Sequence, residues 1–331
     1  MNKKYGILIG TIGGGLWKSD DFSEGFNRVR KPNTIIPPEC NVRAIKVAVD
    51  NSYIIIGTSS GLFLSYDKGG TWIEVNTPTK LQEIWSIEID PNNSNNIFIG
   101  GRPDVFRSKD LGQNWSKLDV GLNNPCPIGI PRVTNIIVDP ENSMNIWLGV
   151  EIDGIYYSRT GGESWKKFTS LGDTSSHNDI HGLVLGQNGS IYATSPLGIA
   201  TTSTRKLNGS WDYHNFERLS KNDKRSYCRG LILKTDDFNT IFVGQGDNIP
   251  GNKGGIQNST DGGKTWKLSE LSHKSNSLIY CFATSKRFPD LIVAASIYGY
   301  IYITVDRGNY WTKQHQEFGE IRSIAIVDYL D

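Results

Sequence analysis

The residues best suited to chemistry cluster in one part of the sequence, where carboxylates and imidazoles alternate. Glu151 and Asp153 stand two residues apart, and His177, Asp179 and His181 follow within one short stretch. Such a set can supply a general acid and a general base, and we predict all five as catalytic candidates. His177, His181 and Glu151 could instead hold one divalent metal ion through nitrogen and oxygen ligands. His177 could also simply face solvent, because the His-x-x-x-His spacing lies in a loop that leads into a strand.

Seven apolar segments recur along the chain, and counting back from their ends gives three aligned rows of side chains. Three residues back, the row is Val47, Ile87, Ile136, Leu183, Leu231, Phe282 and Ile324. Five residues back, it is Ile45, Trp85, Thr134, His181, Arg229, Tyr280 and Arg322. Seven residues back, it is Arg43, Glu83, Arg132, Asp179, Tyr227, Leu278 and Glu320. Strand side chains on one face repeat every two residues, so polar groups should gather at one end of an apolar wall.

This polar end is the predicted ligand site. Its arginines could clamp a carboxylate or another anion, since each guanidinium offers two parallel donors. The predicted ligand-binding residues are Arg43, Glu83, Trp85, Arg132, Tyr227, Arg229, Tyr280 and Arg322. A two-carboxylate glycosidase would draw its pair from Glu83, Glu151, Asp153 and Asp179. The alternative is that the arginine and glutamate side chains only tie neighbouring structural units together.

An eight-residue pattern punctuates the chain and positions these segments. It reads STDGGKTW at 259–266, SYDKGGTW at 65–72 and SKDLGQNW at 108–115. Two further copies, SRTGGESW at 158–165 and TVDRGNYW at 304–311, carry single substitutions. A short Asp side chain can accept backbone N–H donors within a turn, Gly tolerates positive φ, and Trp supplies a large apolar anchor. The pattern therefore indicates a hairpin turn that stabilises the fold.

The five octapeptides resemble the Asp-box, or BNR repeat, of β-propeller proteins. That group includes sialidases, xyloglucan-active glycosidases, sortilin-type receptors and photosystem assembly factors, so the resemblance implies an architecture more than a reaction. It also implies that the inter-blade loops, rather than the Asp-boxes, face the ligand. Sialidases are six-bladed and carry a Phe/Tyr-Arg-Ile-Pro motif that this chain lacks. We therefore do not expect sialidase activity.

The spacing of the repeats predicts an all-β fold, a single seven-bladed β-propeller with four antiparallel strands per blade. Small residues after the second strand of each unit recur at intervals of 43 to 51 residues. The first unit begins at its second strand, and the chain ends with a lone first strand at 321–327. We expect that C-terminal strand to join the N-terminal blade and close the ring, which makes residues 1–331 one domain.

The overall composition excludes some classes of partner and suggests a compartment. The chain has 331 residues, with 35 basic and 34 acidic side chains, and a formal net charge of only +1 does not draw it to nucleic acid or to a membrane. Its four cysteines, Cys40, Cys126, Cys228 and Cys281, are widely spaced and contain no Cys-x-x-Cys pair. The apolar N-terminal stretch aligns with internal strands rather than with a signal peptide. We expect a cytoplasmic protein with free thiols.

The functional prediction is a propeller that binds a small anionic or sugar-like ligand in its central funnel. Acid–base or metal-assisted chemistry would make it a hydrolase, glycosidase-like, or a lyase. The alternative is a non-catalytic scaffold that holds a protein partner or takes part in assembly. The sequence favours catalysis through its concentration of His, Asp, Glu, Tyr and Arg, and favours the scaffold through the absence of a family motif.

Overall fold

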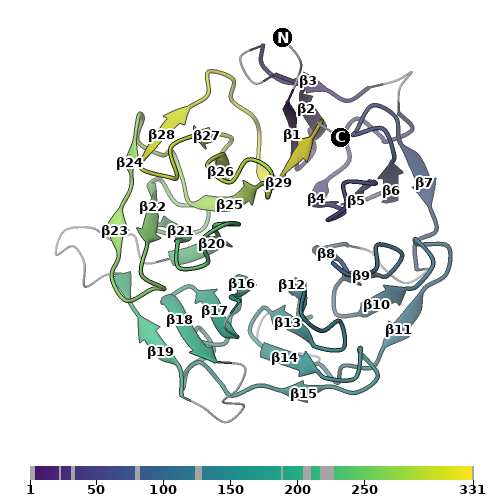
Figure 1. The fold of residues 1–331 in the computed structure, drawn as a ribbon, viewed down its shortest axis with the longest axis vertical. Coiled ribbons are helices and arrows are strands. Elements are labelled where there is room, and N and C mark those ends of the chain that lie inside the picture. Colours follow the sequence, from purple (N-terminus) through teal and green to yellow (C-terminus); the bar gives the residue numbers. More distant parts are fainter. Residues whose placement is uncertain are drawn as a thin grey trace.

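Seven small sheets stand around a common centre like the blades of a propeller (Figure 1). The computed structural model describes residues 4–21, 24–30, 34–78, 83–123, 129–187, 189–203, 210–216 and 227–329. Every blade has four antiparallel strands, and blade 7 has a fifth, parallel strand at its edge. The all-β, seven-bladed prediction is confirmed.

The blades are numbered from the one that holds the N-terminus. Blade 1 consists of β29 (Ile321–Asp328), β1 (Tyr5–Thr11), β2 (Gly15–Ser19) and β3 (Asn27–Arg28). Blade 2 consists of β4 (Val42–Val47), β5 (Ile54–Thr58), β6 (Gly61–Ser65) and β7 (Ile73–Val75). Blade 3 consists of β8 (Ser86–Ile89), β9 (Ile97–Gly100), β10 (Val105–Ser108) and β11 (Ser116–Leu118). Blade 4 consists of β12 (Val133–Val138), β13 (Ile146–Val150), β14 (Gly154–Ser158) and β15 (Lys166–Lys167).

The remaining three blades follow in chain order. Blade 5 consists of β16 (Gly182–Leu185), β17 (Ser190–Ser195), β18 (Gly198–Ser203) and β19 (Asp212–His214). Blade 6 consists of β20 (Tyr227–Leu233), β21 (Ile241–Gly246), β22 (Gly254–Ser259) and β23 (Lys267–Leu268). Blade 7 consists of β25 (Ile279–Thr284), β26 (Ile292–Ser296), β27 (Ile301–Thr304), β28 (Tyr310–Lys313) and the parallel edge strand β24 (Glu270–Leu271).

The C-terminal strand closes the ring, as the sequence predicts. Strand β29 pairs antiparallel with β1, from Tyr5 opposite Asp328 to Thr11 opposite Ile321, so the two ends of the chain form one blade (Figure 1). The innermost strands β4, β8, β12, β16, β20, β25 and β29 surround the centre of the ring. Closure gives blade 1 its innermost strand, and the unpaired edges of the innermost strands all lie at the centre of the ring, where they are short and protected from edge-to-edge association.

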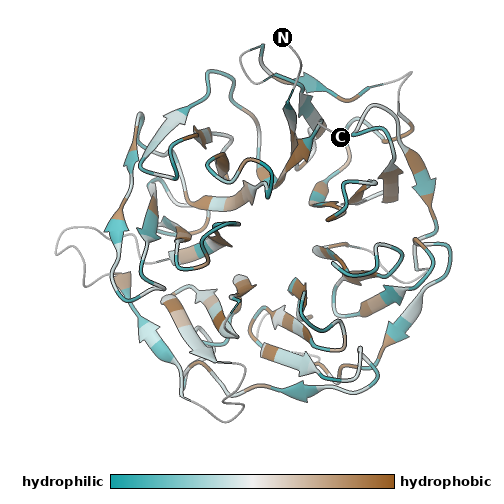
Figure 2. Ribbon diagram, in the orientation of Figure 1, coloured by the Kyte–Doolittle hydropathy of each residue, from teal (hydrophilic) through white to brown (hydrophobic). Residues whose placement is uncertain are grey.

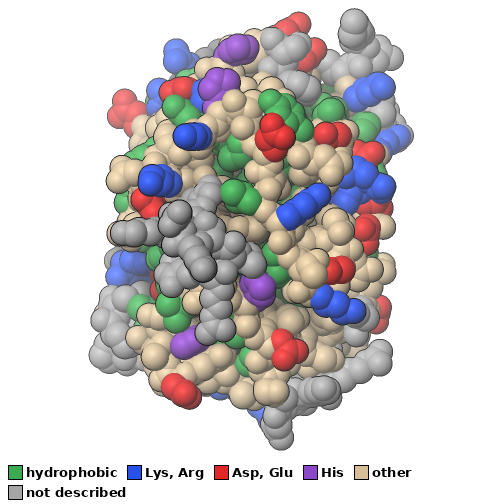
Figure 3. All heavy atoms as spheres, turned by 90° about the vertical axis from the view of Figure 1, so that its left-hand side faces the viewer, with side chains coloured by type: hydrophobic (Ala, Val, Ile, Leu, Met, Phe, Trp, Pro, Cys, Tyr) green, Lys and Arg blue, Asp and Glu red, His purple; other side chains and the backbone are tan. Residues whose placement is uncertain are grey.

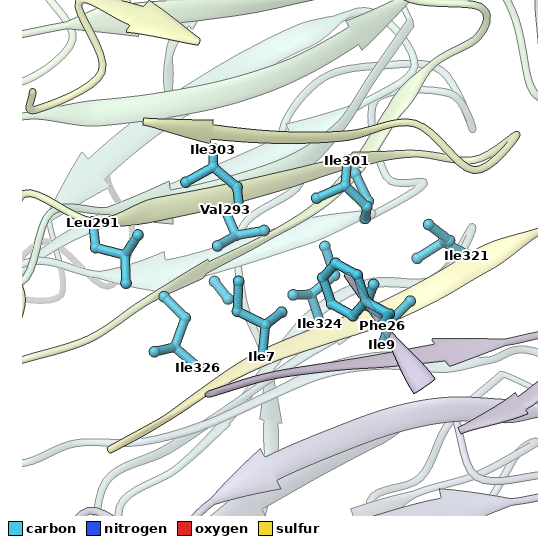
Figure 4. Close-up of a cluster of buried hydrophobic side chains, with 12 residues drawn as sticks. Ile7, Ile9, Phe26, Leu291, Val293, Ile301, Ile303, Ile321, Ile324 and Ile326 are labelled. Carbon is cyan, nitrogen blue, oxygen red and sulfur yellow. The ribbon is translucent and has the colours of Figure 1, made fainter. Parts of the chain in front are cut away.

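Hydrophobic side chains pack between blades, because each sheet buries one face against the next. Between blades 7 and 1, for example, Val293, Ile301 and Ile303 meet Ile7 and Ile324 (Figure 4). Hydrophobic colour gathers on the inner strands, whereas the outermost strands β15, β19 and β23 are largely hydrophilic (Figure 2). On the outer wall shown in Figure 3, acidic and basic side chains are interspersed. The described residues contain no helix that could cross a bilayer.

The five octapeptide turns share one hydrogen-bond pattern. In the turn that begins at Ser259, the Ser259 hydroxyl donates to Asp261 Oδ1 at 2.8 Å and accepts from the Gly263 N–H at 2.9 Å. Asp261 also accepts from the backbone N–H and the hydroxyl of Thr265. The turn at 158–165 keeps this geometry with Thr160 in place of Asp, because the Thr160 hydroxyl accepts the Ser164 N–H at 2.9 Å.

Acidification is expected to weaken these turns together. Hydrogen bonds from the Thr265 side chain and backbone lower the pKa of Asp261 to about 2, and bonds from Asn114 lower the pKa of Asp110. In the unfolded chain the pKa of Asp is about 3.9. The stabilisation that these ionised Asp side chains give to the folded protein is therefore present above that pH and is lost as the pH falls toward 2. Unfolding followed by circular dichroism should show the loss in that window. A D110N/D261N variant should lose less stability there than the parent, and an equal loss would contradict the assignment.

Blade 2 corrects the alignment of the three rows. The Ala48 N–H donates to the Tyr53 carbonyl across the turn, as the Asp90 N–H does to the Asn96 carbonyl, so Ala48, and not Asp50, is the residue equivalent to Asp90. Counting from Ala48 moves Arg43 into the row with Trp85, and Ile45 into the apolar row below. The sequence alignment was wrong here by two residues. Asp50 lies in the turn that follows the strand, and residue spacing alone does not distinguish this turn from the longer turn of blade 3.

Candidate functional site

The seven innermost strands present one residue each at the same level of the ring. These residues are Arg43, Trp85, Thr134, His181, Arg229, Tyr280 and Arg322, and all line one cavity of about 180 Å³. In blades 1, 2, 4, 6 and 7 the strand register shifts at this level, so Arg322, Arg43, Thr134, Arg229 and Tyr280 lie at β-bulges. A bulge turns an extra residue away from regular pairing and re-aims its side chain. Five blades therefore direct these side chains by the same device.

Two aromatic rings each lie between a pair of guanidinium groups. The guanidinium carbons of Arg43 and Arg132 stand 4.6 and 4.8 Å from the centre of the Trp85 ring. On the Tyr280 ring, Arg229 and Arg322 stand at 4.6 and 4.7 Å. Cation–π attraction at these distances holds the guanidinium planes while leaving their N–H donors available. The site thus carries two similar arginine–aromatic–arginine stacks.

Two glutamates connect the arginines of different blades. Glu151 Oε2 lies 2.7 Å from Arg132, and its Oε1 lies 3.1 Å from Arg229. Glu83 lies 3.1 Å from Arg43 and 3.8 Å from Arg102, and it also accepts from Trp85 Nε1. Burial alone would lower the pKa of Arg229, but its attraction to Tyr280 and Glu151 outweighs burial and raises it. Arg229 therefore stays charged, and each carboxylate oxygen of Glu151 pairs with one guanidinium group.

His181 is held so that one ring nitrogen faces two ionisable groups. Its Nδ1 lies 2.9 Å from the carbonyl oxygen of Cys228, which can only accept, so Nδ1 carries a hydrogen. Its Nε2 lies 3.2 Å from both Tyr227 Oη and Asp179 Oδ2. In a neutral ring, Nε2 accepts a hydrogen bond from the Tyr227 hydroxyl. In a protonated ring, Nε2 donates a hydrogen bond to the Asp179 carboxylate. Burial raises the pKa of Tyr227 to about 12, so the phenol remains a donor near neutral pH.

The structure brings part of the predicted catalytic group together. Potential ligand atoms of Glu151, Asp179 and His181 lie within 4.8 Å of one another. Asp153 instead binds Asn123, Tyr156 and Lys167. His177 bonds Thr174 through Nδ1 and packs its ring edge against Tyr213. Neither Asp153 nor His177 lines the described funnel cavities, because their side chains are held in contacts within blade 4 and the rim loops.

A wider cavity of about 380 Å³ forms the mouth above this level. It is lined by five arginines, the carboxylates of Glu83, Glu151 and Asp179, and His181. Several polar atoms here are buried without a hydrogen-bond partner, namely Nε of Arg132, Nε of Arg322 and Oδ1 of Asp179. Buried polar atoms are almost always satisfied, so these three are exceptions among the residues that line the mouth.

Sequence reasoning did not name Arg102, Ile152 or Ile249. All three line the mouth. Arg102 follows β9, Ile152 follows β13 and Ile249 follows β21, so each belongs to a connection between the second and third strands of a blade. The rule that these connections share the face of the inter-blade loops could have identified them. Cys126 lies outside the described residues, whereas Cys40, Cys228 and Cys281 form no disulfide with one another.

The chain matches no protein-family model and no curated protein. Solved structures are similar in fold. The GH74 xyloglucanase of Xanthomonas campestris superposes with a TM-score of 0.69 at 15% identity, covering 95% of this chain but only 53% of that one. The chain therefore spans about half the length of this glycosidase, and 38% of an ancestral GH74 enzyme.

Two other propellers match nearly end to end. YCF48 of Cyanidioschyzon merolae has a TM-score of 0.62 and 15% identity, with 89% of each chain covered. A second YCF48 structure, with a D1 peptide bound, covers 88% of this chain and 85% of that one. A 6-phosphogluconolactonase-like propeller of Bacteroides fragilis reaches a TM-score of 0.67 at 10% identity, with 99% of each chain covered. At these identities the similarity shows the propeller fold alone.

Proposed function

We propose that the central funnel binds a small molecule bearing a carboxylate or phosphate, sugar-like in size. The observation that carries the proposal is the arrangement of five arginines against three carboxylates around the mouth. Cation–π contacts pre-orient four of these guanidinium groups, so little freedom is lost when an anion accepts their N–H donors.

We further propose acid–base chemistry at His181 without a resident metal, of the hydrolase or lyase type. The Nε2 atom can gain or lose a proton without ring movement, because Tyr227 and Asp179 accommodate its two states. Glu151, Asp179 and His181 are close enough to hold a divalent ion, which would supply Lewis-acid chemistry. However, Glu151 already pairs with two arginines, and the five guanidinium groups would repel a cation.

A protein-assembly role is the second candidate. It is favoured by the match to YCF48, which covers 85% of the structure that holds a D1 peptide, whereas the match to the xyloglucanase covers only 53% of that chain. A peptide carboxylate would present the same anionic chemistry to the arginines.

For either function, we propose that the five octapeptide turns are Asp-boxes with a structural role. We also propose a cytoplasmic protein with no nucleic-acid or membrane partner.

Binding should follow the charge of the ligand and the arginines of the funnel. We expect the protein to bind glucuronate and inorganic phosphate but not glucose, measured by isothermal titration calorimetry at fixed ionic strength. Arg132→Gln and Arg322→Gln should each weaken binding about 10- to 100-fold, because each removes a charge-assisted hydrogen bond. Arg307→Gln is the matched control, since that guanidinium is exposed in the β27–β28 turn.

Catalysis is tested on the same variants. His181→Ala should keep its melting temperature within a few degrees and retain glucuronate binding, yet lose any hydrolysis of 4-nitrophenyl glucuronide that the parent shows. If no anion binds the parent, the anion-binding proposal fails. If anions bind and the parent turns over no chromogenic uronide, ester or phosphate, the assembly role takes precedence.

A further inference from the structure

The channel continues below the arginine level into an apolar section. The mouth shares Arg43, Trp85 and Arg322 with the cavity of about 180 Å³, and that cavity shares the same three residues with a third, of about 440 Å³. The three cavities therefore follow one another along the axis of the ring. The lowest opens between Ile45, Ile87, Ile136, Leu183, Phe282 and Ile324.

These side chains form the apolar row of the innermost strands. Leu231 and Phe282 also line the middle cavity, so the apolar surface reaches up to the stacks of Trp85 and Tyr280. Ile45 and Leu231 are only partly buried, which leaves part of their surface facing the channel. Below the row, the Lys46–Glu88 ion pair at 2.6 Å lines one side of the cavity, and Ile137, Val184 and Leu185 line it from other blades. The apolar section thus begins below the arginines and reaches the level of this ion pair.

We infer that the ligand is an amphipathic anion, whose charged head meets the arginines and whose apolar group enters this layer. The inference rests on the proposed function and specifies its substrate class. Benzene fits a cavity of about 150 Å³, so the middle cavity has the volume for a ring or a short alkyl chain, which would lie on its Leu231 and Phe282 side, away from the arginines. The ligand class is therefore a carboxylate or phosphate monoester with an aryl group or a short alkyl chain. A polar ligand without such a group would leave the apolar row of the innermost strands in contact with water.

The test measures affinity against the length of the apolar group. Calorimetry on the full chain compares acetate, butanoate and hexanoate with inorganic phosphate, butyl phosphate and hexyl phosphate. Each methylene that enters the layer should tighten binding about fourfold, until the chain reaches Lys46 and Glu88. The two series distinguish a carboxylate head from a phosphate head.

Leu231→Trp fills the middle cavity, and Ile45→Trp, an independent variant, fills the lower one. Both should bind acetate or phosphate like the parent but lose the dependence on chain length. Ile73→Trp, on the exposed outer strand β7, is the control for adding a tryptophan. Affinity that is flat along both series, with binding still lost in Arg322→Gln, would overturn the inference and leave the proposed function standing. Absence of binding to every anion would overturn both.

Discussion

Deletion of residues 320–331 is expected to prevent the chain from forming a stable ring. The deletion removes β29, which pairs with β1 along its length and packs against β4 and β25. It takes away the buried side chains of Ile321, Ile324, Ile326 and Val327, each of which contributes about 1.5–3 kcal/mol by burial. Their combined contribution is comparable to the whole free energy of unfolding of a domain, about 5–15 kcal/mol.

The measurement is solubility together with thermal unfolding followed by circular dichroism. The truncated chain should precipitate or unfold without a cooperative transition, because the loss exposes the edge of β1. A synthetic peptide of residues 320–331 added in trans should restore the transition, since it can pair with β1 as an additional strand. Melting of the truncated chain at the temperature of the full chain would show that closure does not depend on β29.

Replacement of Trp311 by Ala is expected to destabilise the protein by about 3–5 kcal/mol, as large buried aromatic truncations do. Trp311 is fully buried, and its ring meets Phe242 at 5.7 Å and Phe282 at 6.2 Å. Its Nε1 also donates to the Gly308 carbonyl within the turn. The substitution would leave a cavity between blades 6 and 7, because the hydrogen-bonded strands on either side cannot move together to fill it.

The matched comparison is Trp266→Ala, at the equivalent position of the blade 6 turn. Trp266 keeps the same bond to its turn, to the Gly263 carbonyl at 2.9 Å, but it is only partly buried. Its loss should therefore cost clearly less free energy of unfolding in urea than the loss of Trp311. Equal losses in the two variants would mean that the turn bond, and not burial, determines the contribution of these tryptophans.

The repeat determined the architecture, because each blade depends on features that lie close together in the sequence. Turn residues, strand periodicity and the lone strand at 321–327 predict seven blades and their closure, and the structure confirms both. The same local counting placed Trp85, His181, Arg229, Tyr280 and Arg322 at one level of the funnel. The count failed for Arg43, where one short turn shifted the frame.

Only the tertiary structure decided which of the candidate residues meet. Glu151 bridges Arg132 of its own blade and Arg229, 78 positions along the chain, and Asp179 rather than His177 joins His181. Asp153, two residues from Glu151, binds Asn123, Tyr156 and Lys167 instead. Alternate residues of a turn point in different directions, and side chains from different blades meet only when the ring closes. Spacing along the chain carries neither piece of information, so the pairing of charges in the funnel had to come from the folded structure.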